Sequence, residues 1–216
     1  MSLPSPHLHH SHHYELWYFN ARGRAEPIRM MFVVSGTEYE DHRVKREDWT
    51  AVKATGDLPF GQMPVLFVDG IPIAQTNAIM RYLAKKLDLS GRNDYENAQC
   101  LMYAEGIGDF MMKMRPIFME QDAEEKKKKI VEAQKTFIPE FLTTYTKFYV
   151  ANENSAWFIG SKMTWADIII YNTLESLDEQ HPEVMSQFPK LNTFMTNFQT
   201  VPKIAEWLKN RPKTDF

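Results

Sequence analysis

The sequence predicts a small mixed α/β domain followed by an all-helical domain. Three observations support this fold class. Strand-like and helix-like patterns alternate over residues 14–88, strand patterns stop after the polar segment 88–93, and later apolar residues recur at helical spacing. The length of 216 residues also exceeds one average domain of about 150 residues. We therefore place a boundary near residues 88–94, between a domain at 14–88 and a domain at 94–216.

The first domain has the predicted order β-α-β-α-β-β-α. Residues 14–19 alternate and are rich in aromatic side chains, as in a strand, and Asp69-Gly70 is typical of a hairpin turn. Pro27 suits the first turn of a helix, where its missing N–H costs little. The expected strands are residues 14–19, 39–44, 65–68 and 71–74. The expected helices are 27–35, a short helix or loop at 48–53, and one that Thr76 begins.

The second domain is predicted to be helical throughout. Apolar residues follow an i, i+3, i+4, i+7 pattern in 101–118 and again in 130–149, which predicts two long helices packed as a bundle. We expect Pro139 to kink the second of them. The segment Thr164–Asp167 resembles a capping box at the start of a buried helix. Two short helices follow, the last around residues 203–209.

Composition narrows the classes of function. With 25 Lys and Arg against 28 Asp and Glu, the net charge of −3 argues against nucleic acid or an anionic membrane as the main partner. No apolar run reaches the roughly 18 residues that a membrane span needs, so we expect a cytoplasmic protein. The single cysteine, Cys100, excludes an internal disulfide, a Cys-ligated zinc module and a CxxC redox pair.

Residues 1–13 are predicted to be a disordered tail. This tail is rich in histidine, and it is alternatively an expression tag or a weak metal-binding tract. Because it offers no rigid frame for ligands, we expect no metal site there. The tail histidines are His7, His9, His10, His12 and His13.

Several segments, in order along the chain, carry a family resemblance. They are Tyr14–Glu26, Pro59–Val65, Ala74–Ile79, Arg81–Ala84, Thr164–Asp167 and Arg211–Thr214. From Tyr14 to Phe216 the chain resembles a sigma-class glutathione transferase, and within that class the haematopoietic prostaglandin D synthase type and its invertebrate relatives. The resemblance implies a thioredoxin-like N-terminal domain that binds glutathione. It also implies an all-α C-terminal domain that supplies most of a hydrophobic substrate site.

The resemblance makes Tyr18 the predicted catalytic residue. A redox thioredoxin has CxxC at its first helix, whereas this chain has Asn20-Ala-Arg-Gly23, which leaves activation of a thiol by hydrogen bonding. A phenol is protonated at neutral pH and can donate its O–H to a thiolate, which lowers the pKa of the bound glutathione thiol. Arg24, by the first helix, would add positive charge near the sulfur. The pattern alone favours an ordinary strand aromatic at Tyr18, and only the resemblance favours a catalytic residue.

The resemblance also implies the glutathione-binding residues. Gln75-Thr76 falls where a strand meets a helix, so its N–H groups, hydroxyl and helix dipole suit the γ-glutamyl carboxylate, although the family usually has Ser at the second position. Met63-Pro64 is a candidate cis peptide bond. Asp109 matches a residue that reaches the glutathione of the other subunit, which implies a homodimer. The full predicted set is Tyr18, Trp49, Lys53, Gln62, Met63, Pro64, Gln75, Thr76 and Asp109.

The hydrophobic substrate pocket is predicted from apolar residues that could equally be core residues. The prostaglandin synthase type has a cluster of three acids that can bind a divalent ion. This chain has Glu105, Gly108 and Asp109 there, so we expect no metal. The predicted pocket residues are Phe19, Met111, Met112, Arg115, Ile169, Thr173 and Phe216.

Three functions follow from the resemblance. The first is a glutathione transferase of detoxification, which adds the thiolate to small hydrophobic electrophiles. The second is a glutathione-dependent prostaglandin D synthase, an isomerase that needs the same thiolate. The third is a crystallin-like or other binder of hydrophobic ligands without turnover. Because a storage role does not need a complete thiol site, the first is favoured.

Overall fold

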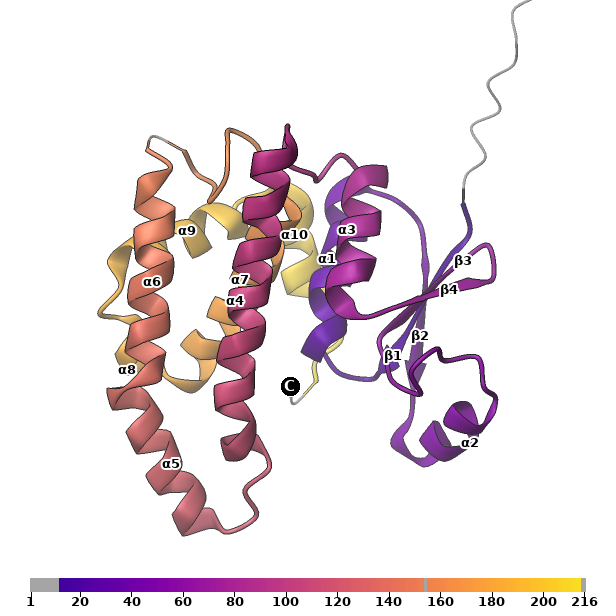
Figure 1. Cartoon of the computed structure of the whole chain (residues 1–216), viewed down its shortest axis with the longest axis horizontal. Helices are drawn as coiled ribbons and strands as arrows, with labels where there is room; N and C mark the ends of the chain where they lie inside the picture. Colours follow the sequence, from indigo (N-terminus) through magenta and orange to yellow (C-terminus); the bar gives the residue numbers. More distant parts are fainter. Residues whose placement is uncertain (1–11, 154, 215–216) are drawn as a thin grey trace, which may run out of the picture. The chain divides into compact units, whose positions relative to one another are not determined.

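The computed structural model describes residues 12–153 and 155–214 (Figure 1). The chain divides into two compact units, one of them built around a sheet and the other helical. The sheet unit consists of Met1–Ala25, Glu38–Ile79 and Thr214–Phe216, and the helical unit of Glu26–Thr37 and Met80–Lys213. Residues 1–11 of the tail predicted at 1–13 lie outside the described residues, as does the predicted pocket residue Phe216.

The sheet unit contains a mixed four-stranded sheet with the order β2-β1-β3-β4. β1 is parallel to β2, and the β1–β3 and β3–β4 pairs are antiparallel. Side chains alternate along β1, where Tyr14 and Leu16 are buried. The strands are β1 (Tyr14–Phe19), β2 (Glu40–Val44), β3 (Val65–Val68) and β4 (Ile71–Ala74), which confirms the four predicted strands.

The β3–β4 hairpin fixes the start of β1. Asp69 and Gly70 both have positive φ, 51° and 80°, as a tight two-residue hairpin turn requires. The main-chain N–H of His13 donates to Asp69 Oδ1 at 2.8 Å, and the N–H of Asp69 donates to the His13 carbonyl at 2.9 Å. The His12 imidazole lies 2.7 Å from Asp69 Oδ2, and this hydrogen bond lowers the pKa of the Asp69 carboxyl. The predicted disorder is therefore wrong for residues 12 and 13.

Short helices connect the strands. The segment predicted as a short helix or loop is helical, a 3-10 turn at Arg46–Asp48 followed by α2 (Trp49–Ala54). α3 (Thr76–Lys86) begins at Thr76, as predicted, and Gln75 alone separates it from β4.

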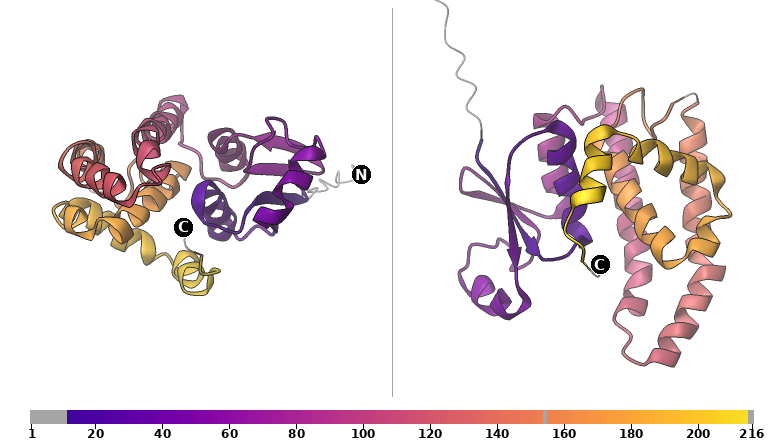
Figure 2. Two further views of the ribbon diagram at one scale, coloured as in Figure 1. Left: turned by 90° about the horizontal axis from the view of Figure 1, so that it is seen from below. Right: turned by 180° about the vertical axis from the view of Figure 1, so that it is seen from behind.

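The helical unit differs from the prediction at Pro139. Where one kinked helix was expected, the structure has two helices. The helical conformation is interrupted at Thr136, whose φ and ψ are −121° and −97°. The proline ring would clash with the carbonyl four residues earlier, so the helix ends before it. Pro139 then falls in the first turn of the next helix, where its missing N–H has no partner to lose. In Figure 2, α4 runs alongside the α5–α6 pair.

After residue 180, the described part of the chain contains three helices, whereas two were predicted. Among the described residues, no helix is long and apolar enough to cross a membrane. This unit also contains the part of α3 from Met80 onward. The helices that lie wholly within it are α1 (Glu26–Ser35), α4 (Asp94–Phe118), α5 (Ala123–Lys135), α6 (Phe137–Ala151), α7 (Trp165–Gln180), α8 (Pro182–Met185), α9 (Pro189–Gln199) and α10 (Pro202–Asn210).

A buried polar network joins α1 and α7 to the end of α10. Arg211 lies 3.0 Å from Glu175 and 3.2 Å from Glu26, and Trp207 Nε1 donates to Glu26 at 2.8 Å. Glu26 and Glu175 are both buried. Because buried carboxylates are costly without partners, this network explains why the terminal segment starting at Arg211 is part of the fold.

Candidate functional site

Tyr18 lies near the end of β1, and its hydroxyl is held by the turn that follows. The main-chain N–H of Arg24 donates to Tyr18 Oη at 3.2 Å. Because the oxygen accepts this bond with a lone pair, its own hydrogen is directed away from Arg24 and is available to a ligand. Accepting a hydrogen bond also makes a hydroxyl a better donor. The turn therefore orients Tyr18 as a donor.

The close approach of the turn depends on Gly23. It has φ +41°, and a Cβ built on it would lie 2.6 Å from Tyr18 Oη. Only glycine fits both the backbone conformation and the space. The sequence indicates a turn at Gly23, whereas its close approach to Tyr18 follows only from the structure.

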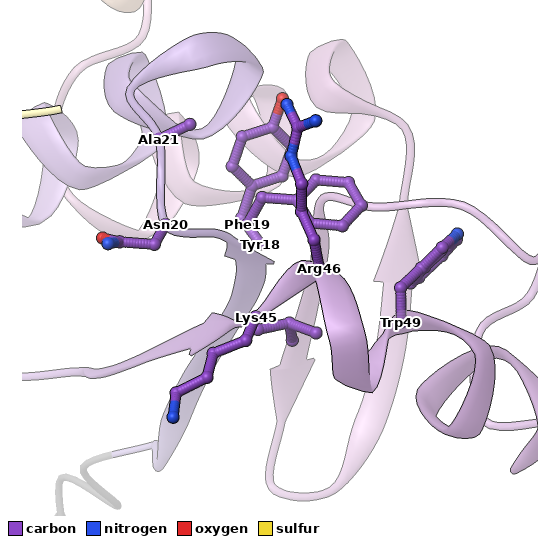
Figure 3. Close-up of a pocket in the computed structure, with 8 residues that line it drawn as sticks. Tyr18, Phe19, Asn20, Ala21, Lys45, Arg46 and Trp49 are labelled. Carbon is purple, nitrogen blue, oxygen red and sulfur yellow. The ribbon is translucent and has the colours of Figure 1, made fainter. Parts of the chain in front are cut away.

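A cavity of about 400 Å³ opens beside Tyr18 (Figure 3). It brings together three predicted site residues, Tyr18, Phe19 and Trp49. Trp49 begins α2, and its ring packs edge-on against Phe19 with centroids 5.3 Å apart. The lining residues are Tyr18, Phe19, Asn20, Ala21, Val44, Lys45, Arg46 and Trp49.

Lys45 and Arg46 also belong to this candidate site, although the sequence analysis did not predict them. Both are exposed cations that directly follow β2, and both line the cavity. A signal existed, because β1 and β2 are parallel and the carboxyl ends of parallel strands meet at one edge of a sheet. Residues 20–21 and 45–46 follow those two ends. The cavity therefore combines aromatic walls with positive charge, which suits an anionic ligand that also has apolar parts.

Lys53, Gln62, Met63 and Pro64 belong to the same unit but do not line this cavity. Lys53 lies one helical turn after Trp49, and its side chain extends over Gly61, where a Cβ would be 3.2 Å from Lys53 Cε. The α2 face thus reaches the loop that contains Gln62. The Met63–Pro64 bond is cis, which confirms that prediction.

Gln75 and Thr76 lie at the junction of β4 and α3. Gln75 has φ +71°, a left-handed conformation that is rare for residues other than glycine, and its carbonyl accepts the N–H of Ile79 at 3.0 Å. Thr76 is the first residue of α3. The first N–H groups of a helix have no partner inside the helix, so this junction can bind a carboxylate.

The remaining predicted site residues lie in the helical unit. Asp109, Met111, Met112 and Arg115 are on α4 and are exposed. Ile169 is buried on α7, and Thr173, one turn later, donates its hydroxyl to the Ile169 carbonyl at 2.9 Å. α4 and α7 pack against each other within this unit.

Cys100 is not a nucleophile. It is fully buried on α4, and burial raises the pKa of its thiol to about 11. A thiol must ionise to attack, so a reactive sulfur at this protein would have to come from a ligand.

Comparison with known proteins identifies the family of both parts of the chain. Residues 14–85 match the family described as glutathione S-transferase, N-terminal domain, and residues 108–211 match glutathione S-transferase, C-terminal domain. The chain is 35% identical to glutathione S-transferase 1 of Ascaris suum, over 94% of this chain and 98% of the relative. It is 37% identical to the hematopoietic prostaglandin D synthase of Gallus gallus, over 93% and 98%.

A solved structure shows the same fold. The structure of rat hPGDS complexed with a quinoline has a TM-score of 0.85 and 34% identity, and the match covers 94% of this chain and all of that one. Sequence and fold thus agree, and the chain belongs to the glutathione S-transferase family.

Proposed function

We propose that this protein is a glutathione transferase, which binds glutathione as the thiolate and adds it to small hydrophobic electrophiles. The observation that carries the proposal is the Tyr18 hydroxyl. It is oriented by the Arg24 N–H and lies in a cavity with aromatic and cationic walls. The curated relatives named above include a glutathione S-transferase, which supports the same conclusion.

The Tyr18 hydroxyl would stabilise the ionised form of the bound thiol. Its O–H donates to the sulfur, and a hydrogen bond to the charged form lowers the pKa of the thiol. The thiol proton leaves to solvent, and the thiolate attacks the electrophile. With a chlorinated nitrobenzene, a carbon–sulfur bond forms, the carbon–chlorine bond breaks, and chloride leaves. Arg24 supplies positive charge at the start of α1.

Other residues of the sheet unit would hold the rest of glutathione. The N–H groups and the hydroxyl at Gln75-Thr76 receive the γ-glutamyl carboxylate. Trp49 and Lys53, on one face of α2, contact the glycyl end. The main chain of Met63 pairs with the cysteinyl residue as an added strand does, with Gln62 and Pro64 beside it. Lys45 and Arg46 add positive charge that attracts the tripeptide.

The residues proposed for the hydrophobic electrophile form a separate set in each unit. Phe19 lines the cavity beside Tyr18. Met111, Met112 and Arg115 on α4, with Ile169 and Thr173 on α7 and Phe216 at the chain end, complete the proposed set. Unbranched methionine side chains adapt to ligands of different shape, which suits a broad range of electrophiles.

We propose a homodimer in which Asp109 reaches the glutathione of the partner. Asp109 lies seven residues after Met102 and three before Met112, so all three share a face of α4. Met102 is 52% exposed and Met112 61%. An apolar face around an exposed acid is typical of a surface that another chain covers. The sigma class, a cytoplasmic location and a role in detoxification belong to the same proposal.

The test is retention on immobilised glutathione followed by conjugation of a chlorinated nitrobenzene. We expect both retention and turnover. Retention without turnover would favour a binding protein, and failure of both would refute the proposal. Prostaglandin H isomerisation is assayed separately, because a relative is a prostaglandin D synthase and the reaction uses the same thiolate.

Replacement of Gly23 by Ala is expected to lower conjugation activity about tenfold or more. The added Cβ would lie 2.6 Å from Tyr18 Oη, so the phenol must move. The positive φ of residue 23 adds a backbone penalty of about 1 kcal/mol. The measurements are kcat/KM and the free energy of unfolding.

Gly56→Ala is the matched control for this prediction. Gly56 also has a positive φ, +80°, but a Cβ there has no atom within 4 Å. The control should share the loss of stability and keep the activity. Equal activities of the two variants would show that the Gly23–Tyr18 contact has no role.

A further inference from the structure

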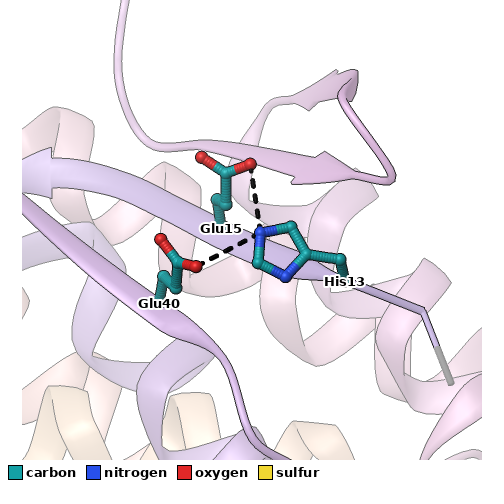
Figure 4. Close-up of side chains that lie close together, drawn as sticks. All are labelled: His13, Glu15 and Glu40. Carbon is teal, nitrogen blue, oxygen red and sulfur yellow. Dashed lines mark ion pairs between the residues drawn. The ribbon is translucent and has the colours of Figure 1, made fainter.

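We propose that β1 and β2 bind one divalent first-row transition-metal ion through His13, Glu15, Glu40 and His42. Figure 4 shows three of these side chains, with one nitrogen of the His13 imidazole facing both carboxylates. The cluster is separate from the cavity beside Tyr18 and shares no residue with it. It also differs from the acids on α4. His13 belongs to the segment 1–13, where no metal site was expected for want of a rigid frame, and its two main-chain hydrogen bonds to Asp69 supply that frame.

The strand register places all four side chains on one face of the sheet. Glu15 and Glu40 are direct partners in the parallel β1–β2 ladder, and so are Trp17 and His42. Side chains two residues apart on a strand share a face. His13 precedes Glu15 by two residues, and His42 follows Glu40 by two. The four groups therefore form a compact cluster without any change of backbone.

Three of the four groups, His13, Glu15 and Glu40, already place one ligand atom each within 4.8 Å of one another. His13 Nε2 lies 3.4 Å from Glu15 Oε1 and 3.3 Å from Glu40 Oε1. His42 Nε2 lies 3.4 Å from Glu15 Oε2 and 3.0 Å from Glu40 Oε2. In a tetrahedral zinc site with bonds of about 2.0–2.1 Å, neighbouring ligand atoms are separated by about 3.3–3.4 Å. His13 Nε2 is already at that spacing from one oxygen of each carboxylate. His42 Nε2 lies near the other oxygen of each, so His42 would join the ion through rotation of side chains alone.

The donor set selects the class of ion. Two imidazole nitrogens with two carboxylate oxygens suit Zn²⁺ or Cu²⁺, whereas Mg²⁺ and Ca²⁺ prefer oxygen ligands alone. Like charges directly opposite each other on neighbouring strands are destabilising, and Glu15 and Glu40 are such a pair. A divalent ion with neutral imidazoles cancels their two negative charges.

The frame of the cluster is fixed on both strands. The main chain of His13 is held by two hydrogen bonds to Asp69, and the His42 ring lies 5.3 Å from the Trp17 ring. β2 is an edge strand that pairs with β1 alone in this sheet. Edge strands are held by one ladder, so an ion shared by the two strands would link the edge to the centre of the sheet. Side chains between 25% and 56% exposed leave the ion a route from solvent.

The test is a calorimetric titration of the full chain with Zn²⁺ in the absence of glutathione. We expect one equivalent to bind. Glu15→Gln with Glu40→Gln should weaken binding at least about tenfold, because loss of ligands costs at least as much as loss of their outer partners. His13→Asn and His42→Asn should each weaken it similarly. All four groups are at the surface, so these variants should keep the circular dichroism spectrum of the wild type.

The matched control removes the tail histidines. His7→Ser, His9→Ser and His10→Ser together should leave the affinity for Zn²⁺ unchanged. Loss of binding in this control would overturn the proposal, as would wild-type affinity in the double glutamine variant or in either asparagine variant.

A second readout uses Trp17. Because its ring neighbours His42, Cu²⁺ bound at the cluster should quench part of the tryptophan fluorescence, and His42→Asn should reduce that quenching. Quenching that is unchanged in His42→Asn would also overturn the proposal.

Discussion

Tyr18→Phe is expected to lower kcat/KM for conjugation about 100-fold at pH 6.5 and to have little effect near pH 9.5. A free thiol has a pKa of about 8.5, so at pH 6.5 only about 1% of it is thiolate. An enzyme that ionises the bound thiol completely therefore raises the fraction of thiolate, and with it the rate, by up to about 100-fold. Above the pKa of the free thiol, glutathione ionises without help, and the advantage of the hydroxyl disappears.

The variant isolates the hydroxyl from the ring. Phe keeps the ring, whose centroid lies 5.7 Å from the centroid of the Phe19 ring. It loses only the oxygen that accepts the Arg24 N–H. Stability and glutathione affinity should therefore change little. The ultraviolet absorbance of the bound thiolate, followed against pH, gives the pKa of the bound thiol directly. We expect that pKa to rise in Tyr18→Phe.

Tyr95→Phe is the control for this prediction. Tyr95 is an exposed residue of α4, and its loss of a hydroxyl should leave the pH profile of the wild type. A deficit of Tyr18→Phe that is the same at every pH would contradict thiolate stabilisation as its role.

The sheet could be predicted from the sequence because local patterns determine it. Alternation along residues 14–19 specifies a strand, and the Asp69-Gly70 turn specifies a hairpin. Each of these signals is contained within a few consecutive residues. The break near Pro139 could not be located in the same way. The helical pattern continues across it, and whether a proline kinks a helix or starts one depends on where the preceding helix ends.

Sequence patterns indicate some residues of the candidate site and miss those that reach it only through a neighbour. Tyr18, Phe19 and Trp49 share one cavity, as expected of one site. Gly23 matters only because its missing Cβ leaves room for the Tyr18 hydroxyl, and that proximity follows from tertiary structure. Lys45 and Arg46 become part of the site only through the parallel pairing of β1 and β2.

Asp167→Ala is expected to lower the free energy of unfolding by about 3–5 kcal/mol. Asp167 is fully buried near the start of α7. It accepts the N–H of Phe158 at 2.8 Å, the N–H of Thr164 at 2.7 Å and the Thr164 hydroxyl at 3.0 Å. The capping box predicted at Thr164–Asp167 is present, and alanine would leave its donors buried without an acceptor. Urea unfolding gives the difference.

The pH dependence of stability separates the charge of Asp167 from its hydrogen bonds. Burial raises its carboxyl pKa from the ordinary 3.8 to about 6, which exceeds the lowering by its hydrogen bonds. Between about pH 4 and 6 the folded state then binds more protons than the unfolded state, so this group's contribution to stability falls as pH rises. Two pKa units at about 1.4 kcal/mol each give a loss of about 3 kcal/mol, complete above pH 6.

Asp167→Asn has no such titration, so its stability relative to wild type should improve over that window and stay constant above it. Asp178→Asn, an exposed residue of the same helix, should follow the wild-type curve. Parallel curves for wild type and Asp167→Asn would contradict a raised pKa at this position, because the folded and unfolded states would then titrate alike.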